Sequence, residues 1–301
     1  MRSYITENAR AWSRRTLLVA ALGMPFIRMA RADPHARIAV VDWALLETLL
    51  AIGAAPVAAT ELVQFRKIAV EPPVPPQVAD LGLRGSPNYE MLLLSRPDLI
   101  VSSPWFAWAE GSLSRIAPVA SYSIYEPGRP PFAPAEQVTN LLGERLGRPR
   151  EAQDYVAATY REIERARQQL AAWTRRPVFL INLGDARHFR VFGPDSMFGD
   201  VLQRIGFENA WPRPTSYGAA APIPLEALAQ VPEATIVIIS STPPDAERTL
   251  ADSPIWNAIP AVRAGRVVML DPINPFGALP SARRFARLLT NALLAAGSEP
   301  A

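Results

Sequence analysis

The chain has 301 residues, of which 49% are hydrophobic and 20% are charged, so it can bury a sizeable core and is long enough for two domains. It contains no cysteine, which excludes disulfides, iron–sulfur clusters, thiolate metal sites and a cysteine-linked lipid anchor. Residues 1–32 hold six arginines and one acid, so the net charge of +3 becomes about −2 for the remainder. No basic footprint for nucleic acid is left.

The N-terminal segment has the pattern of an export signal. Ser13-Arg-Arg-Thr-Leu-Leu18 opens an apolar run to Ile27 that is too short to span a bilayer, and Ala30-Arg-Ala32 is a small-x-small cleavage pattern. This resembles a twin-arginine signal peptide cleaved near Ala32; the alternative is an ordinary secretory leader with a fortuitous arginine pair. Both predict an exported protein in the periplasm.

The first half of the chain alternates strand and helix patterns. It is predicted to contain, in order, a strand at 37–41, a helix at 43–52, an extended proline connector at 72–76, a loop at 82–87, a helix at 88–95 and a strand at 99–102. Gly53 is a natural helix C-cap, and Pro97 stops the second helix. Residues 104–108 form a predicted loop at the carboxyl end of a strand, where open α/β sheets bind ligands.

A long helix is predicted between the two halves. Residues 149–174 are helix formers without internal Gly or Pro and would make a rod of roughly 39 Å. After it we expect, in order, a strand at 178–183 that 190–192 could extend, helices at 194–205 and 226–230, a strand at 235–239, a turn-rich segment at 254–260, a strand at 267–270 and a helix at 281–296.

Two sequence patterns occur once in each half. Glu90 opens E-x-L-x-x-x-x-P-D followed by an apolar run, and Glu226 opens E-x-L-x-x-x-P-E followed by another. Likewise, Glu47-Thr-Leu-Leu-Ala-Ile-Gly53 matches Asp200-Val-Leu-Gln-Arg-Ile-Gly206. Chance could produce either match alone, but together they favour two related α/β lobes, residues 33–148 and 177–301, bridged by the helix of residues 149–176. Two facing lobes predict a ligand cleft between them.

Residues for catalysis and for metal or nucleotide binding are scarce. The chain has no G-x-S-x-G elbow, no P-loop and no G-x-G-x-x-G, and it holds two histidines. One of these, His188, has no neighbouring carboxylate at metal-ligand spacing and is interpreted as a structural or surface histidine. We therefore expect a protein that is not an enzyme and that has no cofactor or metal ligands of its own. An exported hydrolase or redox enzyme remains a distant alternative.

Aromatic residues lie in loops next to predicted strand ends, where they suit a broad apolar ligand with polar edges. The candidates are Trp43, Trp105, Phe106, Trp108, Tyr217 and Phe276. Arg84 lies in a loop flanked by glycines and is the best charged partner for an oxygen-rich ligand, because its guanidinium is a rigid fork of donors. The alternatives are that the aromatics cap their own lobe cores and that the arginine is merely solvated.

The chain resembles the periplasmic ferric-hydroxamate siderophore-binding proteins, a class of ABC-transporter binding proteins whose two lobes are joined by one long helix. Glu71-Pro-Pro-Val-Pro75 and Asp80-Leu-Gly-Leu-Arg84 are fairly specific to that branch, whereas Val191-Phe-Gly-Pro194 and Ala261-Val-Arg-Ala-Gly-Arg266 mark the broader class. The resemblance implies a monomeric binding protein in which Arg84 donates hydrogen bonds to hydroxamate oxygens and the aromatics line the pocket. The siderophore itself would hold the iron.

The resemblance also implies partners, and it has departures. Glu90 and Glu226 match the exposed acids that such proteins present to an inner-membrane permease and its ATPase; the alternative is a carboxylate that favours a helix dipole. Phe106 stands where the family has a tyrosine hydroxyl, and Tyr217 could compensate for it. Asn274 also replaces an aromatic residue. These changes leave another chelate, a catecholate siderophore, cobalamin or haem, as the alternative ligand.

Overall fold

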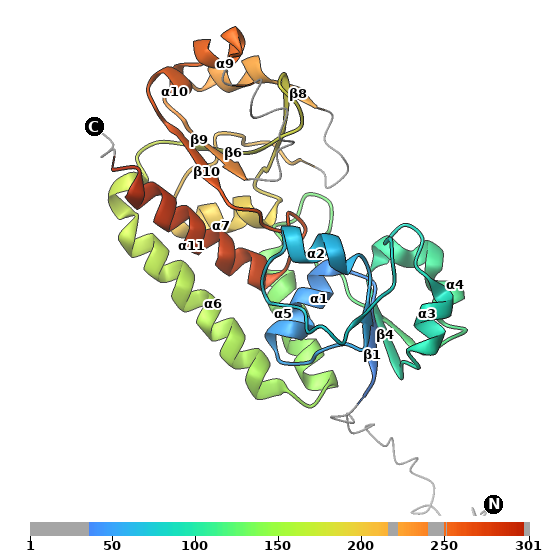
Figure 1. The fold of residues 1–301 in the computed structure, drawn as a ribbon. Helices are drawn as coiled ribbons and strands as arrows, with labels where there is room; N and C mark the ends of the chain where they lie inside the picture. The colour runs from blue at the N-terminus through green and yellow to red at the C-terminus, as the bar shows by residue number, and fades with distance from the viewer. Residues whose placement is uncertain (1–35, 216–221, 240–249, 251, 298–301) are drawn as a thin grey trace, which may run out of the picture. The chain divides into compact units, whose positions relative to one another are not determined.

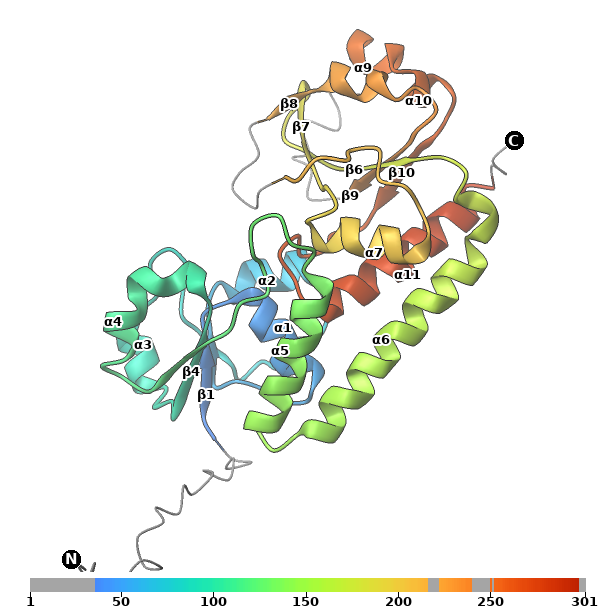
Figure 2. The ribbon, with the colours of Figure 1, turned by 180° about the vertical axis from the view of Figure 1, so that it is seen from behind.

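The computed structural model describes residues 36–215, 222–239, 250 and 252–297. The chain divides into Met1–Arg31 and a compact unit, Ala32–Ala301, to which every element below belongs. The predicted export signal lies outside the described residues. Figures 1 and 2 show the fold from two opposite sides.

Five short strands of the first half form one parallel sheet. They are β1 (Ile38–Val40), β2 (Ala58–Ala59), β3 (Ala79–Asp80), β4 (Leu99–Ser102) and β5 (Val119–Ser121), in the order β3-β2-β1-β4-β5. Both central strands are fully buried, and Ile38 of β1 stands opposite Leu99 of β4. Chain order reverses between β1 and β4, and at such a point the carboxyl ends of parallel strands border a crevice.

Each strand of this sheet is followed in the chain by one or two helices. They are α1 (Trp43–Ala51), α2 (Leu62–Ile68), α3 (Tyr89–Leu94), the 3-10 helix η1 (Pro104–Ala109), α4 (Glu110–Leu113) and α5 (Phe132–Arg145). Asp42 caps α1 and Asn88 caps α3 through side-chain oxygens that accept backbone N–H groups. The prediction of a loop at 104–108 is wrong, because Pro104 begins the helical turns of η1.

The second half begins after α6 (Pro149–Gln169), the long helix predicted to follow the first lobe. Its elements are the 3-10 helix η2 (Ala171–Trp173), β6 (Val178–Leu183), β7 (His188–Val191), α7 (Met197–Ile205), β8 (Ile223–Pro224), the 3-10 helix η3 (Leu225–Gln230), β9 (Thr235–Ile239), α9 (Pro254–Ala258), α10 (Pro260–Arg263), β10 (Val267–Leu270) and α11 (Leu279–Ala295). The sheet order is β10-β9-β6-β7-β8.

Four predictions for the connecting helix and the second half need correction. The helix α6 ends at Gln169 because buried Leu170 leaves helical geometry, so α6 is roughly 31 Å long instead of 39 Å. Residues 190–192 do not extend β6; most of them belong to β7, which turns back antiparallel to β6. The segment at 254–260 forms short helices begun by Pro254 and Pro260, and Glu226 lies on a 3-10 helix, unlike Glu90 on an α-helix.

The predicted repeat is visible in the strand order. Reading outward, β6, β7 and β8 occupy the positions of β1, β2 and β3, while β9 and β10 occupy those of β4 and β5. One difference is that β7 is antiparallel to its neighbours: a hairpin joins β6 to β7, so α7, the sequence match of α1, follows β7 instead of preceding it. The predicted α/β fold with two sheets separated in sequence by one long helix is confirmed.

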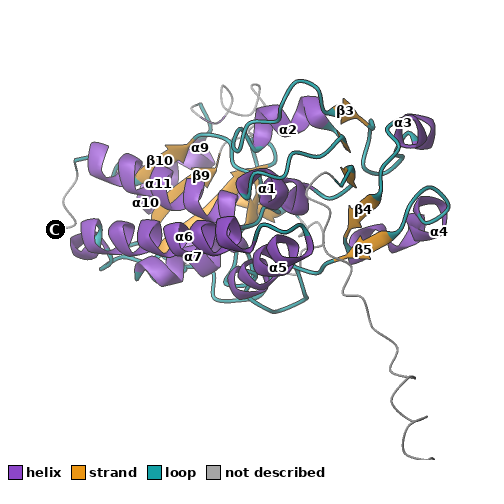
Figure 3. Ribbon diagram, turned by 90° about the horizontal axis from the view of Figure 1, so that it is seen from below, coloured by secondary structure: helices purple, strands orange, loops and turns teal. Residues whose placement is uncertain are grey.

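A layer of helices joins the two halves. Figures 1 and 2 show α6 and α11 side by side, and from below α5, α6, α7 and α11 lie next to one another (Figure 3). One apolar cluster contains Leu49 of α1, Phe198 of α7 and Phe285 of α11, and the last two rings are 5.1 Å apart. The halves therefore share a core in addition to their connecting helix.

The repeated helices α1 and α7 also exchange hydrogen bonds with the opposite half. Glu47 of α1 is fully buried and accepts hydrogen bonds at the start of α11, from Ala278 N (3.0 Å) and from the Ser281 hydroxyl (3.0 Å). Asp200, at the matching position of α7, accepts the Phe132 N–H at the start of α5 (2.9 Å). Each repeated helix thus satisfies a backbone donor that begins the last helix of the other half.

Candidate functional site

One cavity of about 400 Å³ lies where the strands of the first sheet end. Every strand of that sheet supplies lining residues from the segment after its carboxyl end, and the loop after β10 adds one more. The lining residues are Asp42 after β1, Glu61 after β2, Arg84 and Gly85 after β3, Trp105, Phe106 and Trp108 after β4, Tyr125 after β5 and Phe276 after β10. Parallel strands place these segments at one edge, so residues far apart in sequence meet there.

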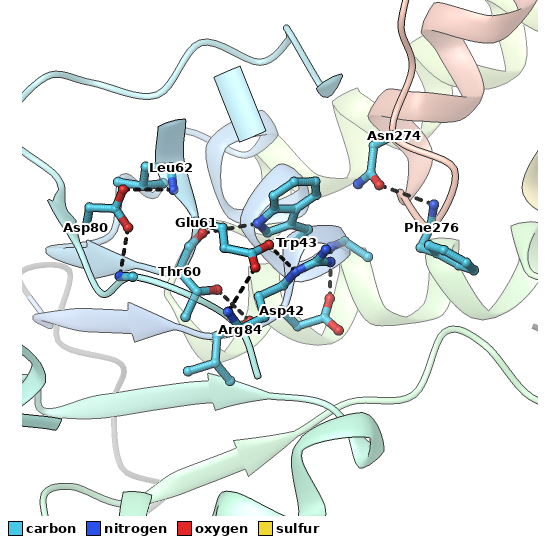
Figure 4. A network of polar contacts seen from close by, with 12 residues as sticks. Asp42, Trp43, Thr60, Glu61, Leu62, Asp80, Arg84, Asn274 and Phe276 are labelled. Carbon is cyan, nitrogen blue, oxygen red and sulfur yellow. Dashed lines mark hydrogen bonds and ion pairs between the residues drawn. The ribbon is translucent and has the colours of Figure 1, made fainter. Parts of the chain in front are cut away.

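Arg84 is held from two sides (Figure 4). Its Nε donates to Glu61 Oε2 at 2.6 Å and its backbone N–H donates to Glu61 Oε1 at 3.1 Å. Its guanidinium carbon lies 4.0 Å from the centre of the Trp43 ring, a cation–π distance. The carboxylate and the ring together fix the plane of the guanidinium, while the side chain keeps 37% of its surface exposed.

The loops that carry Arg84 and Glu61 are tied to each other. The Glu61 N–H donates to Gly82 O at 2.7 Å, and Asp80 accepts the N–H groups of Leu62 (3.1 Å) and Gly82 (2.9 Å) (Figure 4). Glu61 has a left-handed backbone (φ 51°, ψ 42°), an uncommon state for a residue with a side chain. This turn aims its carboxylate at Arg84.

Asp42 adds a half-buried carboxyl group to the cavity. It accepts the Ala44 N–H at 2.8 Å and the Ser103 hydroxyl at 2.8 Å. Burial raises the pKa of Asp42, although these hydrogen bonds and the charge of Arg84 act in the opposite direction. Arg84 therefore faces two acidic side chains, Asp42 and Glu61, within one lining.

Aromatic rings form the walls of the cavity. Trp105 and Trp108 are 61% and 59% exposed, so they present broad apolar surface, whereas Phe106 is buried in the lobe core behind them. Across the cavity, Tyr125 and Phe276 pack edge to face at 6.1 Å, and the Tyr125 hydroxyl donates to Gly277 O. This contact links the first half to the loop that carries Phe276.

Neither a metal cluster nor a membrane span is found in the described part of the chain. No group of three or more His, Asp or Glu side chains there is arranged to hold a metal ion. No helix within those residues is long and apolar enough to cross a bilayer.

A family model described as periplasmic binding protein matches residues 38–273. The chain belongs to this family. It is 31% identical to the iron(3+)-hydroxamate-binding protein FhuD of Escherichia coli over 287 residues, which cover 93% of this chain and 96% of that protein. Periplasmic binding proteins of the hydroxamate branch are thus relatives over nearly the whole chain, which confirms the resemblance seen in the sequence.

Solved structures of related binding proteins have the same fold. The siderophore-binding protein FhuD of Vibrio cholerae, crystallised with Fe³⁺-Desferal, matches with a TM-score of 0.82 and 28% identity over 87% of this chain and 99% of that one. The petrobactin-binding protein YclQ of Bacillus subtilis matches with a TM-score of 0.70 and 16% identity over 86% of this chain and 92% of that one, a likeness of fold alone.

In this member of the family, the cavity brings together most of the predicted site residues. Arg84, Trp105, Phe106, Trp108 and Phe276 all line it. Trp43 does not; it is buried, packs on Phe65 at 5.4 Å and donates from Nε1 to Thr60 O at 3.1 Å, so it is a platform behind Arg84 instead of a wall. Tyr217 lies outside the described residues.

Three further residues of the lining, Asp42, Glu61 and Tyr125, were not predicted from the sequence. Of these, Asp42 alone had a local signal, since an aspartate directly before a helix pattern is a typical N-cap. Glu90 and Glu226 are exposed in the first turns of α3 and η3 and take no part in the cavity.

Proposed function

We propose that this chain binds a ferric hydroxamate siderophore and delivers it to an inner-membrane ABC importer for iron uptake. The observation that carries the proposal is Arg84, fixed by Glu61 and Trp43 at the edge of an aromatic cavity in a relative of hydroxamate-binding proteins. The iron is cargo, held by the siderophore. Protein and ligand meet through hydrogen bonds and apolar contact, so the chain acts as a binding protein and performs no reaction.

The geometry of Arg84 suits the rim of a hydroxamate chelate. Glu61 engages the Nε–H, and the Nη1 and Nη2 groups of the same fork can then donate to hydroxamate oxygens, which carry the negative charge of the ligand. Trp105, Trp108 and Phe276 offer exposed ring surface for the methylene chains between the hydroxamates. Tyr125 places a phenol in the same lining, although its hydroxyl already donates to Gly277 O.

Delivery requires a surface that the transporter recognises. Glu90 on α3 and Glu226 on η3 are exposed acids, one in each half, and each lies in the first turn of its element. We assign them to docking on basic residues of the permease, whose ATPase drives uptake. This role rests on the family resemblance and on the exposure of both carboxylates.

The remaining parts of the proposal concern export and organisation. Residues 1–32 would be a twin-arginine signal cleaved near Ala32, which would release a monomeric protein into the periplasm. The lobes would comprise residues 33–148 and 177–301, with residues 149–176 as the connection. The family's description as periplasmic supports this location.

The test is a tryptophan-fluorescence titration of the mature protein. Trp105 and Trp108 lie at the cavity, so a bound ferric complex should quench their emission. We expect tight binding of ferrichrome or ferric desferrioxamine B and weaker binding of a ferric catecholate, cobalamin and haem. Arg84→Ala should weaken hydroxamate binding by about 100-fold, the scale of losing a charged donor to a partly buried oxygen.

Arg115→Ala is the matched control, because Arg115 is an exposed arginine just after α4 that donates to the Ser112 hydroxyl at 3.1 Å. It should bind as the unchanged protein does, and circular dichroism should show that both variants are folded. Equal affinity of Arg84→Ala and the unchanged protein would remove Arg84 from the site. Preference for cobalamin, haem or a catecholate would contradict the hydroxamate assignment.

A further inference from the structure

The cavity holds a positive charge that its own neighbours offset. Arg84 forms an ion pair with Glu61, and Asp42 lines the same space. Among the described lining residues, these three are the charged ones. With Asp42 protonated these described residues carry no net charge together, and with Asp42 ionised they are negative. In neither state do they attract an anion through net charge.

Glu61 is placed to control this balance. Its side chain is 18% exposed, so solvent screens the pair less than it would screen a surface ion pair. It takes both the Nε–H and the backbone N–H of Arg84, so one carboxylate both orients the fork and cancels its charge. The left-handed backbone at Glu61 and the tie from its N–H to Gly82 O hold it in this position.

Ferric chelates differ in charge by chemical class. Three hydroxamates balance Fe³⁺ and leave a neutral core, whereas three catecholates leave a trianion. A fixed fork without net positive charge can donate hydrogen bonds to the neutral core. It offers no Coulombic gain to the trianion, whose transfer from water into a partly closed site is costly.

We propose that Glu61 is a specificity-determining residue, which positions Arg84 and neutralises its charge so that the site selects neutral or cationic ferric chelates over anionic ones. This rests on the proposed siderophore-binding function and adds to it a cause of discrimination. Arg84 donates the hydrogen bonds to the ligand, and Glu61 determines which ligand charge the site accepts. Its effect on the ligand passes through Arg84 and through the field of its carboxylate.

The test measures affinity against ligand charge. Three ferric complexes of desferrioxamine B, with the terminal amine free, acetylated or succinylated, share one core and form a cation, a neutral molecule and an anion. A ferric tris-catecholate is the fourth probe. The unchanged protein should bind the cation and the neutral complex more tightly than the anion, and the tris-catecholate most weakly. This order requires no variant.

Glu61→Gln removes the charge and keeps an oxygen that can accept from Arg84. In this variant the affinity for the neutral complex divided by that for the tris-catecholate should fall at least about fivefold, because one unit charge is removed within a partly buried site. The affinity for the cation divided by that for the anion should fall by a similar factor. Glu61→Ala, which also frees the fork, should weaken all four complexes. A purely structural role would weaken all four and leave the ratios unchanged.

Glu164→Gln is the matched control for net charge, since Glu164 pairs with Arg167 on the exposed face of α6. It should change neither ratio. Two results would show that Glu61 does not select ligand charge: the unchanged protein prefers the succinylated complex to the free amine, or Glu61→Gln still binds and keeps both affinity ratios. Either result leaves the proposed function intact. If the unchanged protein binds none of the four probes, the proposed function itself fails.

Discussion

Arg84 owes its position to two neighbours that differ in chemistry. Glu61 gives direction through a charged hydrogen bond of 2.6 Å, and Trp43 gives a flat face 4.0 Å below the guanidinium. A surface arginine loses side-chain entropy when a ligand orders it, and this arginine has lost much of it before binding. A preorganised fork therefore binds more tightly than the same residue on a free loop.

Gly277 is a second residue on which the cavity depends. A Cβ at this position would lie 1.9 Å from Ser281 Oγ and 2.6 Å from Glu47 Oε2, well inside contact distance. Gly277→Ala should therefore push the segment that carries Phe276 away from α1. We expect a loss of about 2–4 kcal/mol in the free energy of unfolding, measured by urea denaturation, together with weaker ligand binding.

Gly111→Ala is the control for this change, because no atom lies within 4 Å of the added Cβ and the residue is in α4. The unfolding free energy of this variant should stay the same or rise slightly, as alanine favours a helix. If Gly277→Ala is as stable as Gly111→Ala, the close packing of the Phe276 loop on Glu47 is not what holds the loop.

These residues also show what a sequence can predict about a site. Arg84 was predicted because it lies in a loop flanked by glycines and because the family string from Asp80 ends on it. Glu61 was not, because its contact with Arg84 spans 23 residues and exists only after β2 and β3 have paired side by side. Tyr125 is similar, since it meets Gly277 from 152 residues away. Local patterns reveal donors, and tertiary structure reveals what orients them.

Two helices, α1 and α7, connect the halves through the same position of a repeated pattern. Each is followed within two residues by a glycine with positive φ, 74° at Gly53 and 109° at Gly206. Six residues before each glycine is a buried acid, Glu47 or Asp200. Each acid accepts a backbone N–H at the start of a helix in the other half, so the repeated acids help to hold the two halves together. These two contacts are called the joint between the halves.

Asp200→Ala tests this joint on one side. It leaves the Phe132 N–H without its acceptor and frees Arg204, whose Nε donates to the same carboxylate at 2.7 Å. An unpaired buried donor at a helix start costs about 1–3 kcal/mol, so the thermal midpoint should fall by several degrees in calorimetry. Asp154→Ala, at an exposed site on α6, should leave the midpoint unchanged. Equal midpoints for the two variants would show that Asp200 does not support α5.

The secondary-structure elements were predicted correctly where apolar residues recur at the spacing of one element type, a strand or a helix. The strands β1, β4, β6, β9 and β10 and the helices α1, α3 and α11 were predicted within a few residues. No element was predicted for α5, because its sequence begins with Phe132-Ala-Pro and mixes polar and apolar residues. The hairpin of β6 and β7 was missed because its turn, Gly184 to Arg187, lacks a strong hairpin signal.

At the scale of the molecule, the duplicated strand order and the crossed helix contacts make the two halves one unit. Arg284 of α11 adds to this by donating to Pro272 O and pairing with Glu71, which lies in the first half. The repeat in the sequence predicted two lobes and a cleft. It could not predict that the repeated acids are buried, since burial depends on how α1 and α7 face α11 and α5.

The pH dependence of stability should report on this joint. Burial raises the pKa of Glu47 from 4.5 to about 8, although hydrogen bonds from Asn274, Ala278 and Ser281 lower it. Because folding raises this pKa, the folded protein holds a proton that the unfolded chain releases between pH 4.5 and about 8. The contribution of Glu47 to the free energy of unfolding is therefore most favourable below pH 4.5 and is lost progressively as the pH rises to about 8.

Glu47→Gln isolates this contribution, because the amide has the size of the protonated acid and does not titrate. Relative to the variant, the unchanged protein should lose a few kcal/mol of unfolding free energy between about pH 5 and about pH 9, measured by urea denaturation across that range. Asp42, whose pKa is also raised by burial, is present in both proteins and cancels from the difference.

Glu144→Gln, at an exposed position of α5, is the control, and its unfolding free energy should change with pH as that of the unchanged protein does. A constant difference between Glu47→Gln and the unchanged protein across the range would mean that Glu47 is ionised in the fold throughout that range, held by the start of α11 as a carboxylate. The expected divergence would instead make α11 a helix whose attachment to the first half weakens as the pH rises.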